Sequence, residues 1–116
     1  MNSKTKKMSY DVSLYFEVNG RRYRPIGDIN YTSNVRDVLN AAFDGNYWVE
    51  AIENKVASEA IPLLSAAITK LSGNIKELEA LAPKNGWGSV VGARQFLDTI
   101  RSQCYENPDL FIEISR

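Results

Sequence analysis

The sequence predicts an α+β domain in which a small antiparallel sheet packs against helices. Apolar and polar residues alternate with strand periodicity near both ends of the chain, at 10–18 and 110–115, and apolar residues recur at helical spacing between these ends. Strands and helices that are segregated along a chain are typical of α+β proteins. The chain has 116 residues, of which 44% are hydrophobic and 24% charged, as expected for one folded domain. We therefore divide it into a flexible basic arm, residues 1–8, and a single domain, residues 9–116.

The first predicted element is a β-hairpin. Residues 10–18 alternate with the period of a half-buried strand, and Asn19-Gly20 is a preferred dipeptide for a two-residue type I′ turn. Such a turn sets the register of the two strands. The expected pairs are Val18 with Arg21, Glu17 with Arg22, Phe16 with Tyr23, and Tyr15 with Arg24. This register predicts an aromatic pair on the inner face, and an ion pair and a cation–π pair on the outer face.

Three to four helices are expected to cover the sheet. Helical spacing of apolar residues is found at 34–43, at 58–72, after Asn74, and at 89–106, and a pattern weakened by asparagines is found at 46–56. Start signals support several of these. Asn34 with Asp37 and Asn74 with Glu77 resemble capping boxes, Ser89 is a good N-cap, and Pro62 is expected in or near a first turn. Ile75, Leu78 and Leu81 are expected to face inward.

The last predicted element is a strand at 110–115, in which Ile112 and Ile114 share a face. An isolated hairpin is only marginally stable, so this strand is expected to pair beside the first strand. The predicted sheet therefore has the order 2-1-3.

Catalytic chemistry is not indicated. The chain has no histidine, which excludes Ser-His and Cys-His nucleophile systems and histidine metal ligands. The single cysteine, Cys104, lies on an apolar helix stripe and is expected to be a buried core residue. We expect a protein that is not an enzyme and holds no cofactor or metal. A lone cysteine and the lack of a long apolar stretch favour a cytoplasmic protein that is not inserted in a membrane.

Charge is balanced overall, with 14 basic and 14 acidic side chains, but the first 24 residues are basic. The bases there are Lys4, Lys6, Lys7, Arg21, Arg22 and Arg24. One interpretation is an arm and hairpin that contact the phosphates of a nucleic acid. The other, which short charge clusters favour, is a solvated terminus followed by cross-strand pairing.

Two polar segments are candidate binding sites. Trp87 stands between glycines in the loop 85–88, where it either fills a gap in the core or anchors a partner. The segment 28–34 either caps a helix or binds an anion at the helix start. The candidate partner-binding residues are Trp87, Asn85, Tyr15, Arg22, Arg24 and Tyr31.

Several segments together resemble a family of small proteins encoded by bacteriophages and prophages. They are YDVSL at 10–14, DINYTSNV at 28–35, EAIP at 59–62, NGWG at 85–88, and the C-terminal strand. The resemblance implies no reaction, ligand or functional residue. It implies a context in which small phage proteins act on a host protein, defence nucleases such as CRISPR effectors included.

The leading functional expectation is therefore a non-enzymatic phage-type protein that binds and inhibits or modulates a host protein, an anti-CRISPR-like anti-defence factor being one form. The alternatives are a nucleic-acid-binding accessory protein and a phage structural or assembly component. Pairing of exposed sheet edges in a homodimer also stays open.

Overall fold

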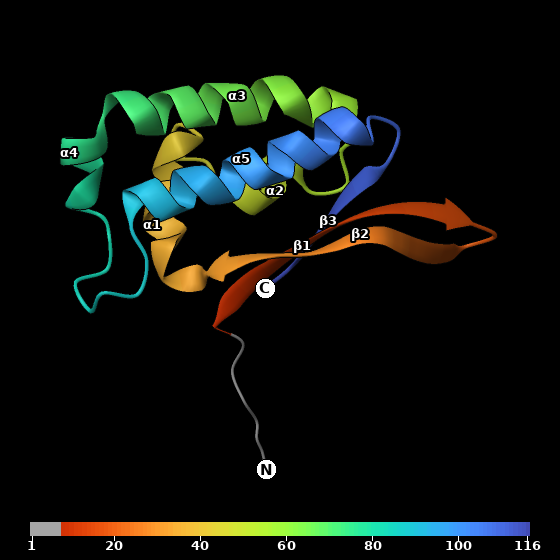
Figure 1. Ribbon diagram of the computed structural model, residues 1–116, viewed down its shortest axis with the longest axis horizontal. Helices are drawn as coiled ribbons and strands as arrows, with labels where there is room; N and C mark the ends of the chain where they lie inside the picture. Colours follow the sequence, from red (N-terminus) through yellow and green to blue (C-terminus); the bar gives the residue numbers. More distant parts are fainter. Residues whose placement is uncertain (1–7) are drawn as a thin grey trace, which may run out of the picture.

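The computed structural model describes residues 8–116 and arranges them in two layers, a sheet and a layer of helices on one of its faces (Figure 1). The three strands are β1 (Ser9–Val18), β2 (Arg21–Thr32) and β3 (Phe111–Ser115), all antiparallel, in the order β2-β1-β3. The predicted α+β class and the 2-1-3 order are confirmed.

The helical layer follows β2 in the chain. Its elements are the 3-10 helix η1 (Ser33–Val35) and the α-helices α1 (Arg36–Ala42), α2 (Trp48–Ile52), α3 (Ala57–Gly73), α4 (Ile75–Glu79) and α5 (Val90–Glu106). The long helices α3 and α5 pack side by side, and α5 also contacts β2 (Figure 1). No helix within residues 8–116 is long and apolar enough to cross a membrane.

The hairpin has the predicted turn but only part of the predicted register. Asn19 and Gly20 both have positive φ, as a type I′ turn requires, and the three pairs nearest the turn form as expected. A register shift between Phe16 and Leu14 places Leu14 opposite Ile26, so the predicted pairing of Tyr15 with Arg24 is wrong. A bulge inserts an extra residue into one strand, which shifts the register beyond it and increases the local twist.

Burial along β1 also differs from the alternation pattern. Phe16 and Tyr23 stack on each other as predicted, with ring centroids 5.3 Å apart, but they are 38% and 43% exposed because the hairpin extends beyond the helices (Figure 1). Tyr15, which was expected on the outer, exposed face, is only 5% exposed. Its ring packs against Phe111, and its hydroxyl donates a 2.9 Å hydrogen bond to the Asn54 side chain.

β2 is longer than predicted. The segment expected to be a polar loop continues the strand to Thr32, and the Ser33 N–H donates to the Met8 carbonyl at 3.1 Å. The capping box at Asn34 is wrong, because the Thr32 side chain accepts the Asn34 N–H instead. Ile29 points toward the core and is buried. Packing of this side chain therefore favours a strand over a loop in this segment.

Helix termini confirm some signals and contradict others. The Ser89 hydroxyl caps α5 by accepting the Gly92 N–H at 2.9 Å, as predicted. Asn74 does not cap α4: its amide donates to the Lys70 carbonyl and closes the end of α3. Pro62 lies in the second turn of α3, and Leu81 is 43% exposed rather than inward.

The core lies between the sheet and the helices and is centred on Trp48. This side chain from α2 is fully buried and contacts Tyr10 and Phe96 edge to face, with ring centroids 4.8 and 5.7 Å away. Leu14 and Ile112 of the sheet belong to the same buried cluster. The core therefore joins both layers through one large aromatic residue.

Candidate functional site

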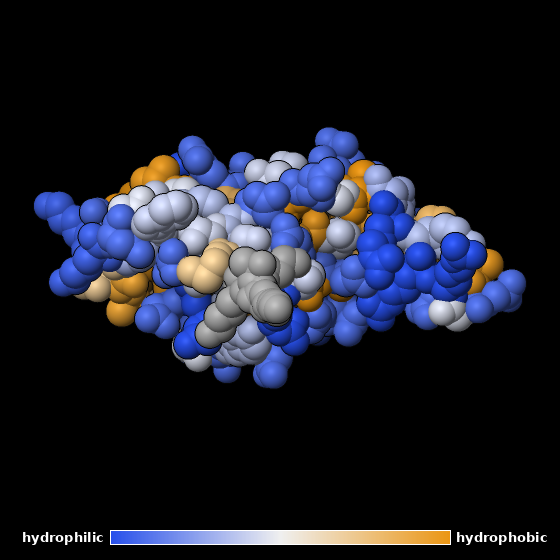
Figure 2. Space-filling view, turned by 90° about the horizontal axis from the view of Figure 1, so that it is seen from below, coloured by the Kyte–Doolittle hydropathy of each residue, from blue (hydrophilic) through white to orange (hydrophobic). Residues whose placement is uncertain are grey.

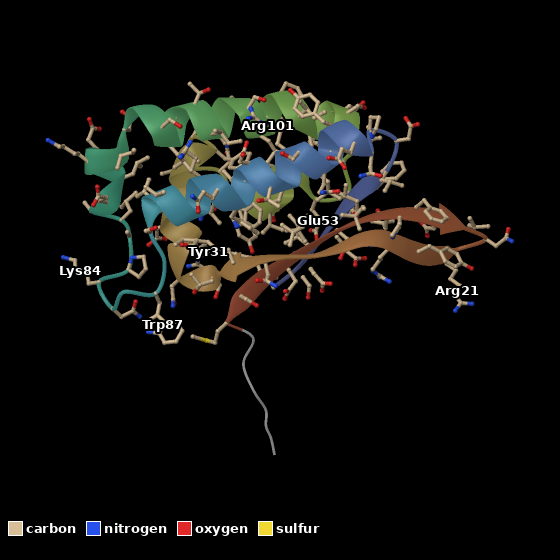
Figure 3. The ribbon with its side chains drawn as sticks, viewed as in Figure 1. Arg21, Tyr31, Glu53, Lys84, Trp87 and Arg101 are labelled. Atoms are coloured by element: carbon tan, nitrogen blue, oxygen red, sulfur yellow. The ribbon has the colours of Figure 1, made fainter. Side chains whose placement is uncertain are left out.

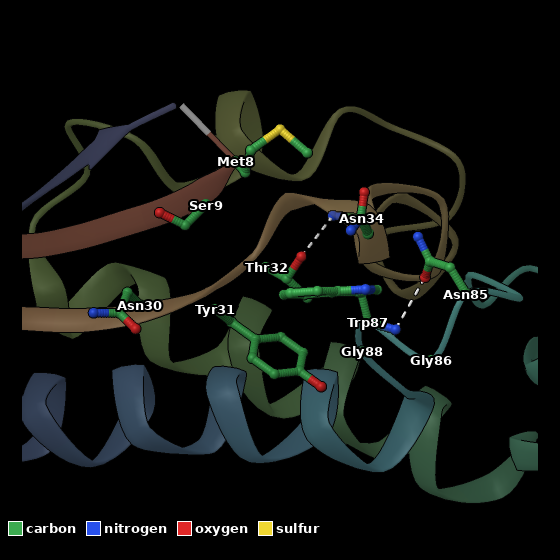
Figure 4. A pocket seen from close by; sticks show the side chains of 10 residues that line it. All are labelled: Met8, Ser9, Asn30, Tyr31, Thr32, Asn34, Asn85, Gly86, Trp87 and Gly88. Carbon is green, nitrogen blue, oxygen red and sulfur yellow. Dashed lines mark hydrogen bonds between the residues drawn. The ribbon is translucent and has the colours of Figure 1, made fainter. Parts of the chain in front are cut away.

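A groove lies where the end of β2 meets the loop before α5 (Figure 4). It has a volume of about 630 Å³. Its lining residues are Met8, Ser9, Asn30, Tyr31, Thr32, Asn34, Asn85, Gly86, Trp87 and Gly88. We call this the Trp87 groove. None of its lining residues is charged, and its lining combines a large apolar ring with several amides, a composition found in ligand-binding sites.

Trp87 is 67% exposed, so the predicted role in which it fills a gap in the core is wrong, and its role as an anchor for a partner stays a prediction. Figure 4 shows the indole lying across the groove beside Thr32. The loop is held locally: the Asn85 side chain accepts the Trp87 N–H at 2.9 Å. Gly86 and Gly88 both have positive φ, which glycine adopts without strain. The ring is therefore presented by a shaped loop, although it is open to solvent.

Tyr31 connects this loop to the helical layer. It is half-buried, its ring lies 5.9 Å from that of Phe96, and its hydroxyl accepts the Ser89 N–H at 3.1 Å. A Cβ at Gly92 would lie 1.9 Å from the hydroxyl oxygen, so glycine is needed there for Tyr31 to reach α5. Tyr31 thus fixes the position of the loop and lines the groove at the same time.

The candidate residues of the hairpin form a separate group. Arg22 and Arg24 both bind the carboxylate of Glu113 on β3, Arg22 at 2.8 Å, and the Arg22 guanidinium lies 4.1 Å from the centre of the Tyr15 ring. The bond from Arg24, followed by that from Arg22, lowers the pKa of Glu113. These arginines tie β2 to β3 across the central strand, and this ion pairing offsets part of their charge.

A first prediction concerns this ion-pair cluster. Because its pKa is lowered in the folded state, Glu113 stabilises the fold above the ordinary glutamate pKa of about 4.3, and this stabilisation is lost as the pH falls. Glu113→Gln is expected to lower Tm at pH 7 by a few degrees at most, since the cluster is partly exposed. Circular dichroism melts from pH 7 to pH 3 should show the two proteins converging.

The matched control is Glu106→Gln, which removes an exposed carboxylate that forms no ion pair within residues 8–116. Its Tm should stay close to that of the wild type at every pH. A Glu113→Gln curve that runs parallel to the wild type down to acid pH would contradict the ion-pair interpretation.

The structure divides the six predicted partner-binding residues into two groups of three. Tyr31, Asn85 and Trp87 meet at the groove, whereas the hairpin carrying Arg21 lies at the opposite end of the molecule (Figure 3). The hairpin end is mainly hydrophilic in space-filling view (Figure 2). Asn30, Thr32 and Asn34 belong to the segment 28–34 that the sequence indicated as a candidate binding site, whereas sequence reasoning missed Met8 and Ser9, which reach the groove because Ser9 pairs with Thr32.

The other predicted sites are placed as follows. Lys4, Lys6 and Lys7 lie outside the described residues. Cys104 is fully buried, as predicted, and burial raises the pKa of its thiol to about 11, so it is protonated at neutral pH. In the part of the chain that the structure describes, no three acidic, cysteine or histidine side chains are grouped so as to hold a metal ion.

Comparisons of the chain with protein-family models, with curated proteins and with solved structures find no match. No function is therefore transferred to the chain from a relative. Its role has to be judged from its own residues.

Proposed function

We propose that the protein is a non-enzymatic binding protein that contacts a partner protein through the Trp87 groove. The observation that carries the proposal is the exposure of Trp87, which is 67% solvent-accessible although it belongs to a loop held by hydrogen bonds. Tryptophan is the residue type most enriched among interface hot spots. An indole exposed on a shaped loop offers a large apolar surface that a partner can bury on binding.

The kind of partner is part of the same proposal. The resemblance to phage-encoded proteins makes a bacterial host protein the expected partner, with inhibition of a defence nuclease as one form of the activity. The lack of charge in the groove favours a protein over a nucleic acid there, because phosphate recognition depends on basic side chains. The basic hairpin keeps nucleic-acid binding as the alternative, and a role in virion assembly as another.

The test is an affinity pull-down of the tagged full chain from host lysate, with and without nuclease, read by mass spectrometry. We expect one host protein to be recovered at similar yield with and without nuclease. This protein should not be recovered with Trp87→Ala, because that variant lacks the anchoring ring. Tyr105→Ala is the matched control: Tyr105 is 61% exposed on α5 and lies outside the groove.

Recovery that disappears with nuclease would contradict the proposal in favour of the nucleic-acid alternative. Equal losses with Trp87→Ala and Tyr105→Ala would show that the groove is not the contact surface. Recovery only of this chain itself would favour self-association or assembly.

A further inference from the structure

The Trp87 groove lies at the end of the open edge of the sheet. β2 pairs with β1 on one side, and within residues 8–116 no strand pairs with its other side. The outer edge of β3 is already occupied: the segment 54–57 exchanges main-chain hydrogen bonds with Leu110 and Ile112 at 2.7–3.0 Å. An added strand therefore has one edge to join, that of β2.

The groove continues along this edge between β2 and α5. Asn30 and Tyr31 line both the Trp87 groove and a second hollow of about 280 Å³, and Asp28 and Ile29 line the second and a third of about 490 Å³. The contribution of α5 is Gly92, Gln95, Phe96, Thr99 and Gln103. Asp28 is the one charged residue that lines any of these three hollows. A channel between an edge strand and a helix has the shape that takes an extended peptide.

The main chain of β2 presents hydrogen-bonding groups to this channel. In an antiparallel pair, residues alternate between those bonded to the partner strand and those whose N–H and C=O point away from it. Ser33 donates to Met8, and the register then makes Tyr31 and Ile29 the bonded positions opposite β1. The N–H and C=O groups of Asn30 and the N–H of Thr32 consequently point toward the open edge, whereas the C=O of Thr32, the N-cap of η1, accepts the first hydrogen bond of that helix.

The usable edge is short. Pro25 has no N–H to offer, and Asp28 has φ of 62°, which interrupts an extended strand. Strand addition is thereby confined to the stretch 29–32 beside Trp87. An edge interrupted in this way resists continuous pairing with a second copy of β2 and favours a short segment.

We propose that the groove takes a short, extended and uncharged segment of the partner protein as an added strand beside β2. The segment pairs with the main chain of Asn30 and Thr32 and places an apolar side chain against Trp87 and Met8. This inference rests on the proposed function and names the partner's binding element. The neutral lining of the groove makes the interaction nearly independent of salt, unlike binding to phosphates.

The probe is a displayed library of random peptides of about eight residues, which span about 26 Å when extended, selected on the full chain. We expect enrichment of uncharged peptides with one apolar residue, bound by the wild type and not by Trp87→Ala. In the best peptide, N-methylation of the residue that pairs with Asn30 should weaken binding and N-methylation of its two neighbours should not, because alternate N–H groups face β2. Tolerance of methylation at all positions, or failure of the library to enrich, would overturn the proposal.

Asn30→Pro tests the same contact from the protein side. The Asn30 N–H does not bond to β1, so proline removes only the outward donor and is tolerated on an edge strand. We expect at least about tenfold weaker peptide binding, the loss expected for about one hydrogen bond, with an unchanged circular dichroism spectrum. Asn30→Val keeps the N–H and changes only a lining side chain of the groove, so its loss of binding should be clearly smaller than that of Asn30→Pro.

These outcomes separate the two proposals. Binding lost with Trp87→Ala but kept with Asn30→Pro and through the N-methyl scan would leave the proposed function standing and remove strand addition. Equal losses with Asn30→Val and Asn30→Pro would assign the contact to the side chain and overturn strand addition. A host protein captured independently of Trp87 would overturn both.

Discussion

Trp48→Ala is expected to lower the free energy of unfolding by about 3–5 kcal/mol, the range for removing a large buried aromatic side chain. Trp48 is fully buried and contacts Tyr10 of β1 and Phe96 of α5, so the cavity would open between the two layers. Small domains have only about 5–15 kcal/mol of stability in total. Urea unfolding followed by far-ultraviolet circular dichroism measures the difference.

Trp48→Phe is the control for this prediction. The indole Nε1 makes no hydrogen bond within the part of the chain that is described, so phenylalanine removes volume without breaking a polar contact. Its loss of stability should be clearly smaller than that of Trp48→Ala. Equal losses would mean that the position depends on the indole itself rather than on filled volume, and a loss below about 1 kcal/mol for alanine would place Trp48 outside the core.

Gly88→Ala is expected to give the largest effect in the groove. Gly88 has φ of 111°, and an added Cβ would lie 2.6 Å from a Val35 methyl carbon and 2.8 Å from a Thr32 methyl carbon. Backbone strain and overlap together should cost about 2–4 kcal/mol of stability. The loop would move away from the end of β2, and partner binding through Trp87 should fall with it. Thermal melts and the pull-down measure the two effects separately.

Gly86→Ala separates strain from crowding. Gly86 also has positive φ, but nothing lies within 4 Å of a Cβ built there, so only the backbone cost of about 1 kcal/mol applies. We expect it to keep the groove and most of the binding. If both alanine variants lose the same amount of stability, close packing of Gly88 against Val35 and Thr32 does not hold the loop.

The inferred binding mode explains why the exposed Trp87 and the open edge of β2 occur together. Main-chain hydrogen bonds to an added strand give affinity that does not depend on the side chains of that strand. Contact of one of its apolar side chains with Trp87 adds selectivity. A small protein with about four residues of usable edge therefore depends strongly on that anchor. The ion-pair cluster of Arg22, Arg24 and Glu113 joins β2 to β3, and none of its residues lines the groove.

Elements with local signals were predictable from the sequence. Asn19-Gly20 determines the turn through its positive φ values, and Ser89 determines the start of α5 through its hydroxyl. The predicted strand 110–115 and the α5 stripe, including Cys104, were equally readable. In each case the physical cause acts within a few residues or along one periodic face.

The positions of the functional candidates were not predictable in the same way. Alternation placed Phe16 inside and Tyr15 outside, yet the helices end before Phe16, whereas Phe111, Arg22 and Asn54 cover Tyr15. The bulge near Leu14 depends on packing as well. Periodicity shows which residues share a face, and it does not show what covers that face.

The sequence by itself determined the α+β class, the strand order, the turn and the long helices, because local conformational preferences and hydrophobic periodicity act along the chain. Tertiary structure decided that Trp87 is exposed, that β2 runs on to Thr32, and that Asn30 faces an open edge. These properties depend on contacts between distant parts of the chain, such as Ser33 with Met8 and Tyr31 with Ser89. Only the packed chain brings such residues together, and they are the ones that form the groove.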